Sequence, residues 1–183
     1  MIIGLIGTMA SGKGEVVNYL KTKGFEHYVY SDILKDIAKN RGILPTRANL
    51  QKLGAQIKKE SGNLGILSKN ILKKIKTDKA VVDGVRNSAE IRELRKAKDV
   101  YVVSVTAPQR LRFMRLMKRK RDGDPKTFSD FKRLDNLENR GKTKGQEINK
   151  CLRIVDFSIT NSGSLEQLKK RVDETLGAML SPS

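Results

Sequence analysis

The chain has 183 residues, of which 38% are hydrophobic and 32% are charged. This composition is typical of one compact globular domain and excludes a disordered or fibrous chain. A single cysteine and a single histidine exclude an internal disulfide and a Cys/His zinc site of ordinary spacing. No apolar run reaches the ~20 residues needed to cross a bilayer, so we expect a cytoplasmic protein without a membrane partner.

The net charge is strongly positive, because 38 Lys and Arg residues stand against 20 Asp and Glu residues, a formal balance of +18. Residues 109–150 hold 14 basic and 6 acidic side chains, whereas residues 151–183 hold four of each. Such an excess predicts an anionic partner, either a polyphosphate substrate or a nucleic acid, although a Lys-rich thermophile surface has the same composition.

The first third of the chain reads as strand, loop, helix and strand. The apolar run MIIGLIG predicts a buried strand, and a Gly-rich turn separates it from a helical pattern. A second strand is predicted over residues 27–30, where a side-chain oxygen of Ser31 or Asp32 can cap the helix that follows. Gly42 and Pro45 are expected to end that helix.

The middle of the chain begins with a wholly helical block over residues 46–75, interrupted at the Ser-Gly-Asn sequence of residues 61–63. Strand character returns at residues 79–83 and, after a helix, at residues 100–105. A helix is predicted over residues 109–121, before the sequence Asp-Gly-Asp-Pro ends it.

The last third predicts a polar helix over residues 128–139, a Gly- and Lys-rich mobile segment at 141–145, a strand at 154–160 and a helix at 165–180. Strands that alternate with helices are typical of parallel sheets. We therefore predict an α/β fold with three layers, in which helices cover both faces of a parallel sheet of about five strands.

The segment from Gly7 to Lys13 matches the G-x-x-x-x-G-K pattern of a phosphate-binding loop (P-loop), and it lies between a predicted strand and a predicted helix. Glycines allow backbone N–H groups to surround a phosphate, the helix N-terminus adds partial positive charge, and Lys13 reaches the terminal phosphates. We predict that ATP binds here with Mg²⁺. The predicted ATP-binding residues of this segment are Gly7, Thr8, Met9, Ala10, Ser11, Gly12, Lys13, Gly14 and Glu15.

Gly14 departs from the usual P-loop pattern, in which a Ser or Thr hydroxyl ligates Mg²⁺ at this position. The metal must therefore be held by another residue. Glu15 can bind the metal through water, or it can serve as an acidic residue that stabilises the first helical turn. Both interpretations of Glu15 stay open.

Four segments together resemble the nucleoside-monophosphate-kinase group of P-loop kinases, adenylate kinase included. They are GTMASGKG, SDILKDIAKNRG, VVDGVR and the Arg-rich stretch that precedes the Gly/Lys-rich segment, and the resemblance spans nearly the whole chain. It implies that Asp83 lies near the water shell of the metal and that Arg86 holds the acceptor phosphate. The turn from Asp83 to Arg86 is one residue shorter than the common pattern of the group.

The C-terminal sequence SITNSGSLEQLKKRVDETL is similar to the same segment of dephospho-CoA kinases. In both groups this turn lies against adenine, so the resemblance implies that backbone groups near Asn161 and Gly163 bind ATP. The middle of the chain lacks the His-Pro and Pro-Leu-Leu-type segments of dephospho-CoA kinases. The monophosphate kinases are therefore the favoured relatives.

Residues 109–121 hold a dense basic run without an acidic residue. On a helix, Arg112, Arg115 and Arg119 share one face, and guanidinium groups stabilise the charge of a phosphoryl group in transfer. We predict that Arg115 or Arg119 is catalytic. The alternative is a solvated basic face.

Asp32 follows the second strand, where P-loop kinases with a hydroxyl acceptor carry a base. A phosphate acceptor needs no base, and Ser31 and Asp32 would then bind the base or ribose of the substrate. His27 is expected to be an ordinary packing residue, and Cys151 an inert structural thiol.

The predicted activity is transfer of the γ-phosphoryl group of ATP to a nucleoside or deoxynucleoside monophosphate, with this small-molecule nucleotide as the main partner. One domain spans residues 1–183, with a core at 1–30, 77–121 and 147–183, a substrate flap at about 31–76 and a lid at about 122–146. Dephospho-CoA kinase is the alternative, and a nucleotide-gated RNA-binding protein is the second alternative. The predicted catalytic residues are Lys13, Asp83, Arg86, Arg115 and Arg119.

Overall fold

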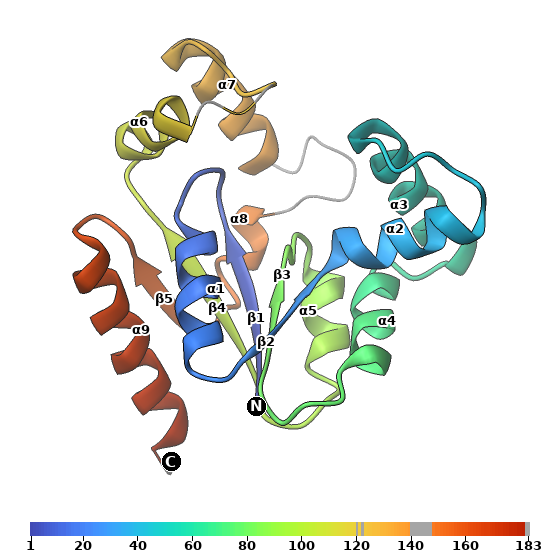
Figure 1. The fold of residues 1–183 in the computed structure, drawn as a ribbon, viewed down its shortest axis with the longest axis horizontal. Coiled ribbons are helices and arrows are strands. Elements are labelled where there is room, and N and C mark those ends of the chain that lie inside the picture. The colour runs from blue at the N-terminus through green and yellow to red at the C-terminus, as the bar shows by residue number, and fades with distance from the viewer. Residues whose placement is uncertain (120, 122, 140–147, 182–183) are drawn as a thin grey trace.

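The structure is a computed structural model that describes residues 1–119, 121, 123–139 and 148–181. Within these residues, five strands form one parallel sheet in the order β2-β3-β1-β4-β5 (Figure 1). This arrangement confirms the predicted α/β fold. The strands are β1 (Ile2–Gly7), β2 (Glu26–Val29), β3 (Ala80–Asp83), β4 (Val100–Thr106) and β5 (Phe157–Thr160).

Helices connect the strands and cover both faces of the sheet. Because every strand pair is parallel, all five carboxyl ends lie at one edge, where ligands bind in open α/β sheets. The helices are α1 (Lys13–Thr22), α2 (Tyr30–Asn40), α3 (Arg47–Ser61), α4 (Ile66–Lys74), α5 (Ser88–Leu94), α6 (Gln109–Arg119), α7 (Phe128–Asn139), α8 (Ile148–Cys151) and α9 (Leu165–Leu180).

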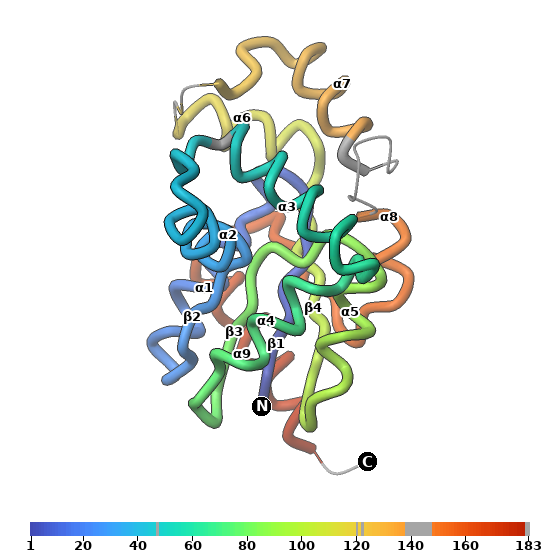
Figure 2. The backbone as a smooth tube through the Cα atoms, turned by 90° about the vertical axis from the view of Figure 1, so that its right-hand side faces the viewer, coloured from blue at the N-terminus to red at the C-terminus, as the bar shows by residue number. Residues whose placement is uncertain are grey.

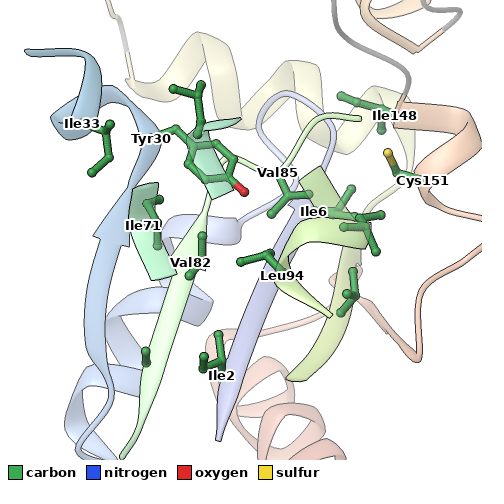
Figure 3. Packing of buried hydrophobic residues seen from close by; sticks show 14 residues of the cluster. Ile2, Ile6, Tyr30, Ile33, Ile71, Val82, Val85, Leu94, Ile148 and Cys151 are labelled. Atoms are coloured by element: carbon green, nitrogen blue, oxygen red, sulfur yellow. The ribbon is translucent and has the colours of Figure 1, made fainter. Parts of the chain in front are cut away.

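The two faces of the central strand β1 belong to two separate hydrophobic clusters. Ile3 and Leu5 pack with residues of α1 and α9, whereas Ile2 and Ile6 pack with residues of α4, α5 and α8 (Figure 3). Successive side chains of a strand point to opposite faces of a sheet, so a strand covered on both sides must be apolar throughout. This explains the uninterrupted apolar sequence at the N-terminus.

Two helical units lie beyond the carboxyl edge of the sheet. Helices α2 and α3 lie on one side of the chain segment that joins β1 to α1, and helices α6 and α7 lie on the other (Figure 1); the side view of Figure 2 also places α3 and α7 toward this edge. Helices α2 and α3 share a small hydrophobic cluster around Ala38, Leu53 and Ile57. The predicted break after α3 is confirmed, because Gly62 ends the helix in the left-handed conformation, at φ 61°.

The predicted cap of the second helix is wrong. Strand β2 ends at Val29, and Val29 is itself the N-cap of α2 without a side-chain hydrogen bond. The chain passes from strand to helix with no connecting residue, so Ser31 and Asp32 already lie in the first helical turn. There Asp32 accepts a hydrogen bond from Lys35, at 2.8 Å, instead of capping the helix.

The last strand is shorter than the predicted 154–160, because the chain pairs with β4 only from Asp156 onward; the short helix α8 before it was not predicted. The Asp156 carboxylate accepts the N–H of Val102 at 2.7 Å, next to the first backbone bond of the pair. The segment 141–145 lies outside the described residues. No helix within the described part of the chain is both long and apolar enough to span a membrane.

Candidate active site at the carboxyl edge of the sheet

The predicted P-loop connects β1 to α1 at the middle of the carboxyl edge. Ala10 and Gly12 both have positive φ angles, of 57° and 99°, and Gly12 is the N-cap of α1. Alternation of left- and right-handed residues ahead of a helix directs backbone N–H groups toward a common anion. The Lys13 ammonium donates to the carbonyl oxygen of Gly7 at 2.9 Å and so joins the two ends of the loop. The loop has the geometry of a phosphate cradle.

Asn161 and Arg115 hold the P-loop from the side of β5 and α6. The Asn161 side-chain amide donates to the carbonyl oxygen of Ser11 at 2.9 Å. The Arg115 guanidinium donates to the backbone and side-chain oxygens of Asn161, at 3.0 and 3.1 Å, and to the Ser11 carbonyl at 3.4 Å. Burial lowers the pKa of Arg115, which still leaves an arginine charged at neutral pH. Two residues from distant parts of the chain therefore fix the loop: Arg115 and Asn161 lie 104 and 150 positions after Ser11.

Arg112 contacts the P-loop as well, but its guanidinium forms an ion pair with Asp135, a residue that the sequence analysis missed. Its guanidinium pairs with the Asp135 carboxylate of α7 at 2.6 and 2.7 Å and donates to the carbonyl oxygen of Met9 at 3.1 Å. Asp135 is only 2% exposed. The signal for its burial was its place one helical turn after the buried Phe131.

Arg119 does not share the surroundings of the other two arginines. Its guanidinium donates two hydrogen bonds to Asp124, at 2.8 and 2.9 Å, in the connection between α6 and α7. The three arginines of the predicted common face therefore have different partners. Arg112 binds α7, Arg115 binds the P-loop and Arg119 binds Asp124. Arg115 is the predicted catalytic arginine that contacts the P-loop in this structure.

Asp83 ends β3 next to the strand that leads into the P-loop, in register with Leu5 of β1. Its Oδ1 atom is buried and has no hydrogen-bond partner among the described residues. A buried acceptor without a partner costs about 1–3 kcal/mol, so this oxygen fits a donor or cation that arrives with a ligand. Glu15, the other predicted metal residue, is exposed in the first turn of α1.

Mg²⁺ fits this arrangement only together with a nucleotide. The described residues contain no group of three or more His, Cys, Asp or Glu side chains that could hold a metal ion by themselves. Mg²⁺ is usually bound by one or two carboxylates, phosphate oxygens and water. Asp83 would supply the carboxylate, and Gly14 supplies no hydroxyl.

The second half of the site lies where β2 and β3 end side by side, with Val29 in register with Asp83. Ser31 and Asp32 follow β2, and the turn containing Arg86 follows β3. The Arg86 side chain is exposed and has no ion pair with a residue that the structure describes, whereas Asp32 is paired with Lys35. Arg86 is therefore a cation without an ion pair among the described residues, and it follows β3, the strand that pairs with β1 before the P-loop.

Three further residues of the sequence analysis can be placed in the structure: Gly163, His27 and Cys151. Gly163 lies against Gln167, which closes the capping box of α9 on the Ser164 N–H, and a β-carbon at Gly163 would collide with it. His27 is exposed on the edge strand β2, so its prediction as a packing residue is wrong. Cys151 is buried among apolar residues, as a structural thiol would be.

The geometry agrees with three comparisons to known proteins. A family model described as an AAA domain matches residues 3–154. A UPF0200 protein of Pyrococcus abyssi is 33% identical over 189 residues, which cover 98% of this chain and 97% of that protein. A UPF0200 protein of Hyperthermus butylicus is 30% identical over 181 residues, covering 98% and 95%.

Two solved kinases share the fold at low sequence identity. Shikimate kinase from Acinetobacter baumannii in complex with shikimate aligns with a TM-score of 0.59 at 16% identity, covering 99% of this chain and 95% of that one. Deoxyadenosine kinase from M. mycoides aligns with a TM-score of 0.54 at 14% identity, covering 97% and 100%. The chain is thus a P-loop protein with a kinase-like fold, and it belongs to the UPF0200 family.

Proposed function

We propose that this protein transfers the γ-phosphoryl group of ATP to a nucleoside or deoxynucleoside monophosphate. The observation that carries the proposal is the contrast between two side chains at the ends of β2 and β3. Arg86 is exposed without an ion pair among the described residues, while Asp32 is paired with Lys35. An acceptor that brings a phosphate dianion needs the cation and no base.

On the donor side, the P-loop N–H groups and Lys13 bind the β- and γ-phosphates of ATP. Arg115 lies against the loop through Ser11 and Asn161, where its charge offsets that on the phosphoryl group in transfer. Asp83 is the residue that would hold Mg²⁺, whose charge offsets that of the phosphates. Arg86 positions the acceptor phosphate in line with the γ-phosphoryl group.

Water must be kept from the γ-phosphoryl group, and the two helical units beyond the sheet can do this. In our proposal, residues 31–76 form a flap and residues 122–146 form a lid that close on substrate. The small cluster shared by α2 and α3 supports movement of these two helices together, whereas α4 also packs in the larger cluster beside β1. The remaining residues form the core of a single domain.

The first test is a coupled assay of ADP release with each ribo- and deoxyribonucleoside monophosphate and with dephospho-CoA. Arg86→Ala is expected to lower kcat/KM for the monophosphate by about 100-fold, with most of the loss in acceptor KM. Asp32→Asn is expected to lower it less than about tenfold. Arg92→Ala is the control, because Arg92 is an exposed arginine of the neighbouring helix α5.

Asp32 makes dephospho-CoA kinase the second candidate, because its carboxylate is exposed in the first turn of α2 at the same edge as Asp83. A hydroxyl acceptor loses a proton as it attacks, and Asp32→Asn would then lower the rate by about 10²–10⁴-fold. Turnover of dephospho-CoA alone, with Asp32→Asn the more damaging variant, would replace our proposal with this one. Absence of turnover with every acceptor, together with salt-resistant RNA binding, would instead indicate an RNA-binding protein.

A further inference from the structure

A buried carboxylate stands beside the acceptor half of the site. Glu90 of α5 is 1% exposed, and its two oxygens accept hydrogen bonds from two different segments. Oε2 accepts the backbone N–H of Arg86 at 2.8 Å, and Oε1 accepts the Lys58 ammonium of α3 at 2.8 Å. One side chain thus joins the turn that carries Arg86 to a helix of the flap.

The backbone of Glu90 is tied to the two other flap helices. Its carbonyl oxygen accepts the Ser68 hydroxyl of α4 at 2.8 Å, and the Ser68 hydroxyl oxygen is 2.7 Å from that of Tyr30, the first residue of α2. Burial, with the nearby charge of Glu90, raises the pKa of Tyr30 well above its ordinary value, so the phenol stays protonated. Helices α3 and α4 therefore both bond to Glu90, and α2 is joined to it through Ser68.

The network is buried, because Glu90 and Ser68 are 1% and 0% exposed, and its Tyr30 belongs to the larger hydrophobic cluster. A buried ion pair gives little net stability, because desolvation of both charges offsets most of their attraction. An apolar residue at position 90 would fill the same space without that cost. The feature that an apolar residue cannot supply is a pair of acceptors, one for the Arg86 N–H and one for Lys58.

We propose that Glu90 is a positioning residue for the acceptor phosphate. It fixes the backbone of Arg86, and through Lys58 it links the position of Arg86 to that of α3. The inference rests on the proposed function, because Arg86 is placed there on the acceptor. Glu90 itself touches neither substrate.

The test compares Glu90→Gln, Lys58→Gln and the control Lys59→Gln, which changes the next, exposed lysine of α3. A glutamine offers one acceptor oxygen where the carboxylate offers two, so Glu90→Gln must lose one of its two bonds. Kinetics are measured with AMP, CMP, GMP and UMP. We expect Glu90→Gln to raise the KM for the monophosphate at least about tenfold and the KM for ATP less than twofold, and we expect no change in Lys59→Gln.

A second variant pair separates positioning from a general loss of structure. The double variant Arg86→Ala/Glu90→Gln is expected to have a kcat/KM less than twofold below that of Arg86→Ala alone, because Glu90 acts through Arg86. Losses that multiply, or an equal rise of both KM values, would overturn the inference. If Glu90→Gln does not fold, Lys58→Gln is used for the same comparison, and its acceptor KM is expected to be about threefold higher than that of the unaltered protein. An unchanged acceptor KM in Lys58→Gln would overturn the link to α3.

Hydrogen exchange at the backbone amide of Arg86 distinguishes failure of this inference from failure of the proposed function. If no monophosphate is phosphorylated by the unaltered protein, the proposed function fails. Faster exchange at this amide in Glu90→Gln than in the unaltered protein would still support the positioning contact. Unchanged exchange would overturn it, whatever the substrate is.

Discussion

Arg112 and Asp135 form a doubly hydrogen-bonded ion pair that joins α6 to α7 inside the protein. The two bonds measure 2.6 and 2.7 Å, and the side chains are only 6% and 2% exposed. The same guanidinium donates to the Met9 carbonyl of the P-loop at 3.1 Å. The position of α7 is therefore connected to the phosphate cradle through one arginine.

Arg112→Met is expected to destabilise the protein by about 3–5 kcal/mol, because it leaves the Asp135 carboxylate buried without its charge partner. Urea unfolding at pH 7 measures the change. Lys118→Met, on an exposed position of the same helix, is expected to cost less than about 0.5 kcal/mol. The double variant Arg112→Met/Asp135→Leu should recover much of the loss, and equal stability of Arg112→Met and Lys118→Met would contradict the assignment.

Lys13→Ala is expected to abolish phosphoryl transfer without unfolding the protein. The ammonium reaches the terminal phosphates, where it offsets charge in the transition state, and its loss should lower kcat by at least about 10²–10³-fold. ADP release measures activity, and thermal unfolding monitors the fold. Lys21→Ala, an exposed position near the end of α1, should leave turnover unchanged. Normal turnover in folded Lys13→Ala would refute the phosphate-binding role of the loop.

Two glycines two residues apart should respond to alanine in opposite ways. Gly12 has a φ of 99°, and a β-carbon there would collide with the Asn161 amide, so Gly12→Ala should destabilise the protein and weaken ATP binding. Gly14 is helical, and its β-carbon would meet nothing within 4 Å. Gly14→Ala should therefore stabilise the protein by about 0.5–1 kcal/mol.

Thermal unfolding and titration with a fluorescent ATP analogue compare the two variants. For the stability measurement, Gly14→Ala is the matched control, because it adds the same methyl group to the same segment. If Gly12→Ala binds the analogue as tightly as the unaltered protein does, then the close approach of Asn161 is not needed for the cradle.

Tyr19→Phe is expected to raise the pKa of Asp173, the residue that joins α9 to α1. The Tyr19 hydroxyl donates to this carboxylate at 2.6 Å, and that bond, followed by Lys23, holds its pKa below the ordinary 3.8. A carboxyl group with a lowered folded-state pKa contributes stability above its unfolded pKa, and this contribution disappears as the pH falls through the folded pKa. Tyr19→Phe should therefore lose stability at pH 7 and show a weaker fall below about pH 4.

Carboxyl-carbon NMR titration measures the pKa of Asp173 directly, and urea unfolding at several pH values measures the stability. Asp36 serves as the internal reference, because its pKa is lowered by a different partner, Lys74 of α4. A shift of both carboxyl groups would indicate a general change of structure. An unchanged Asp173 pKa would show that the Tyr19 bond is absent in solution.

The sequence by itself determined the elements whose cause is local. Strand β1 is apolar because it is covered on both faces, Gly12 of the phosphate-binding loop adopts a φ of 99°, and α9 begins at the Ser164 capping box. Each of these features can be recognised from a short stretch of the sequence. The order of the five strands then follows the pattern of P-loop kinases, to which the first segments already pointed.

Only the tertiary structure decided which partner each arginine of α6 binds. Arg112, Arg115 and Arg119 share one helical face in the sequence pattern, yet they pair with Asp135, with Asn161 and with Asp124. Helical periodicity states which side of a helix a residue occupies but not what lies opposite, because the partner comes from another part of the chain. A contact between Arg115 and a residue 46 positions later exists only once β5 and α6 are placed beside the same loop.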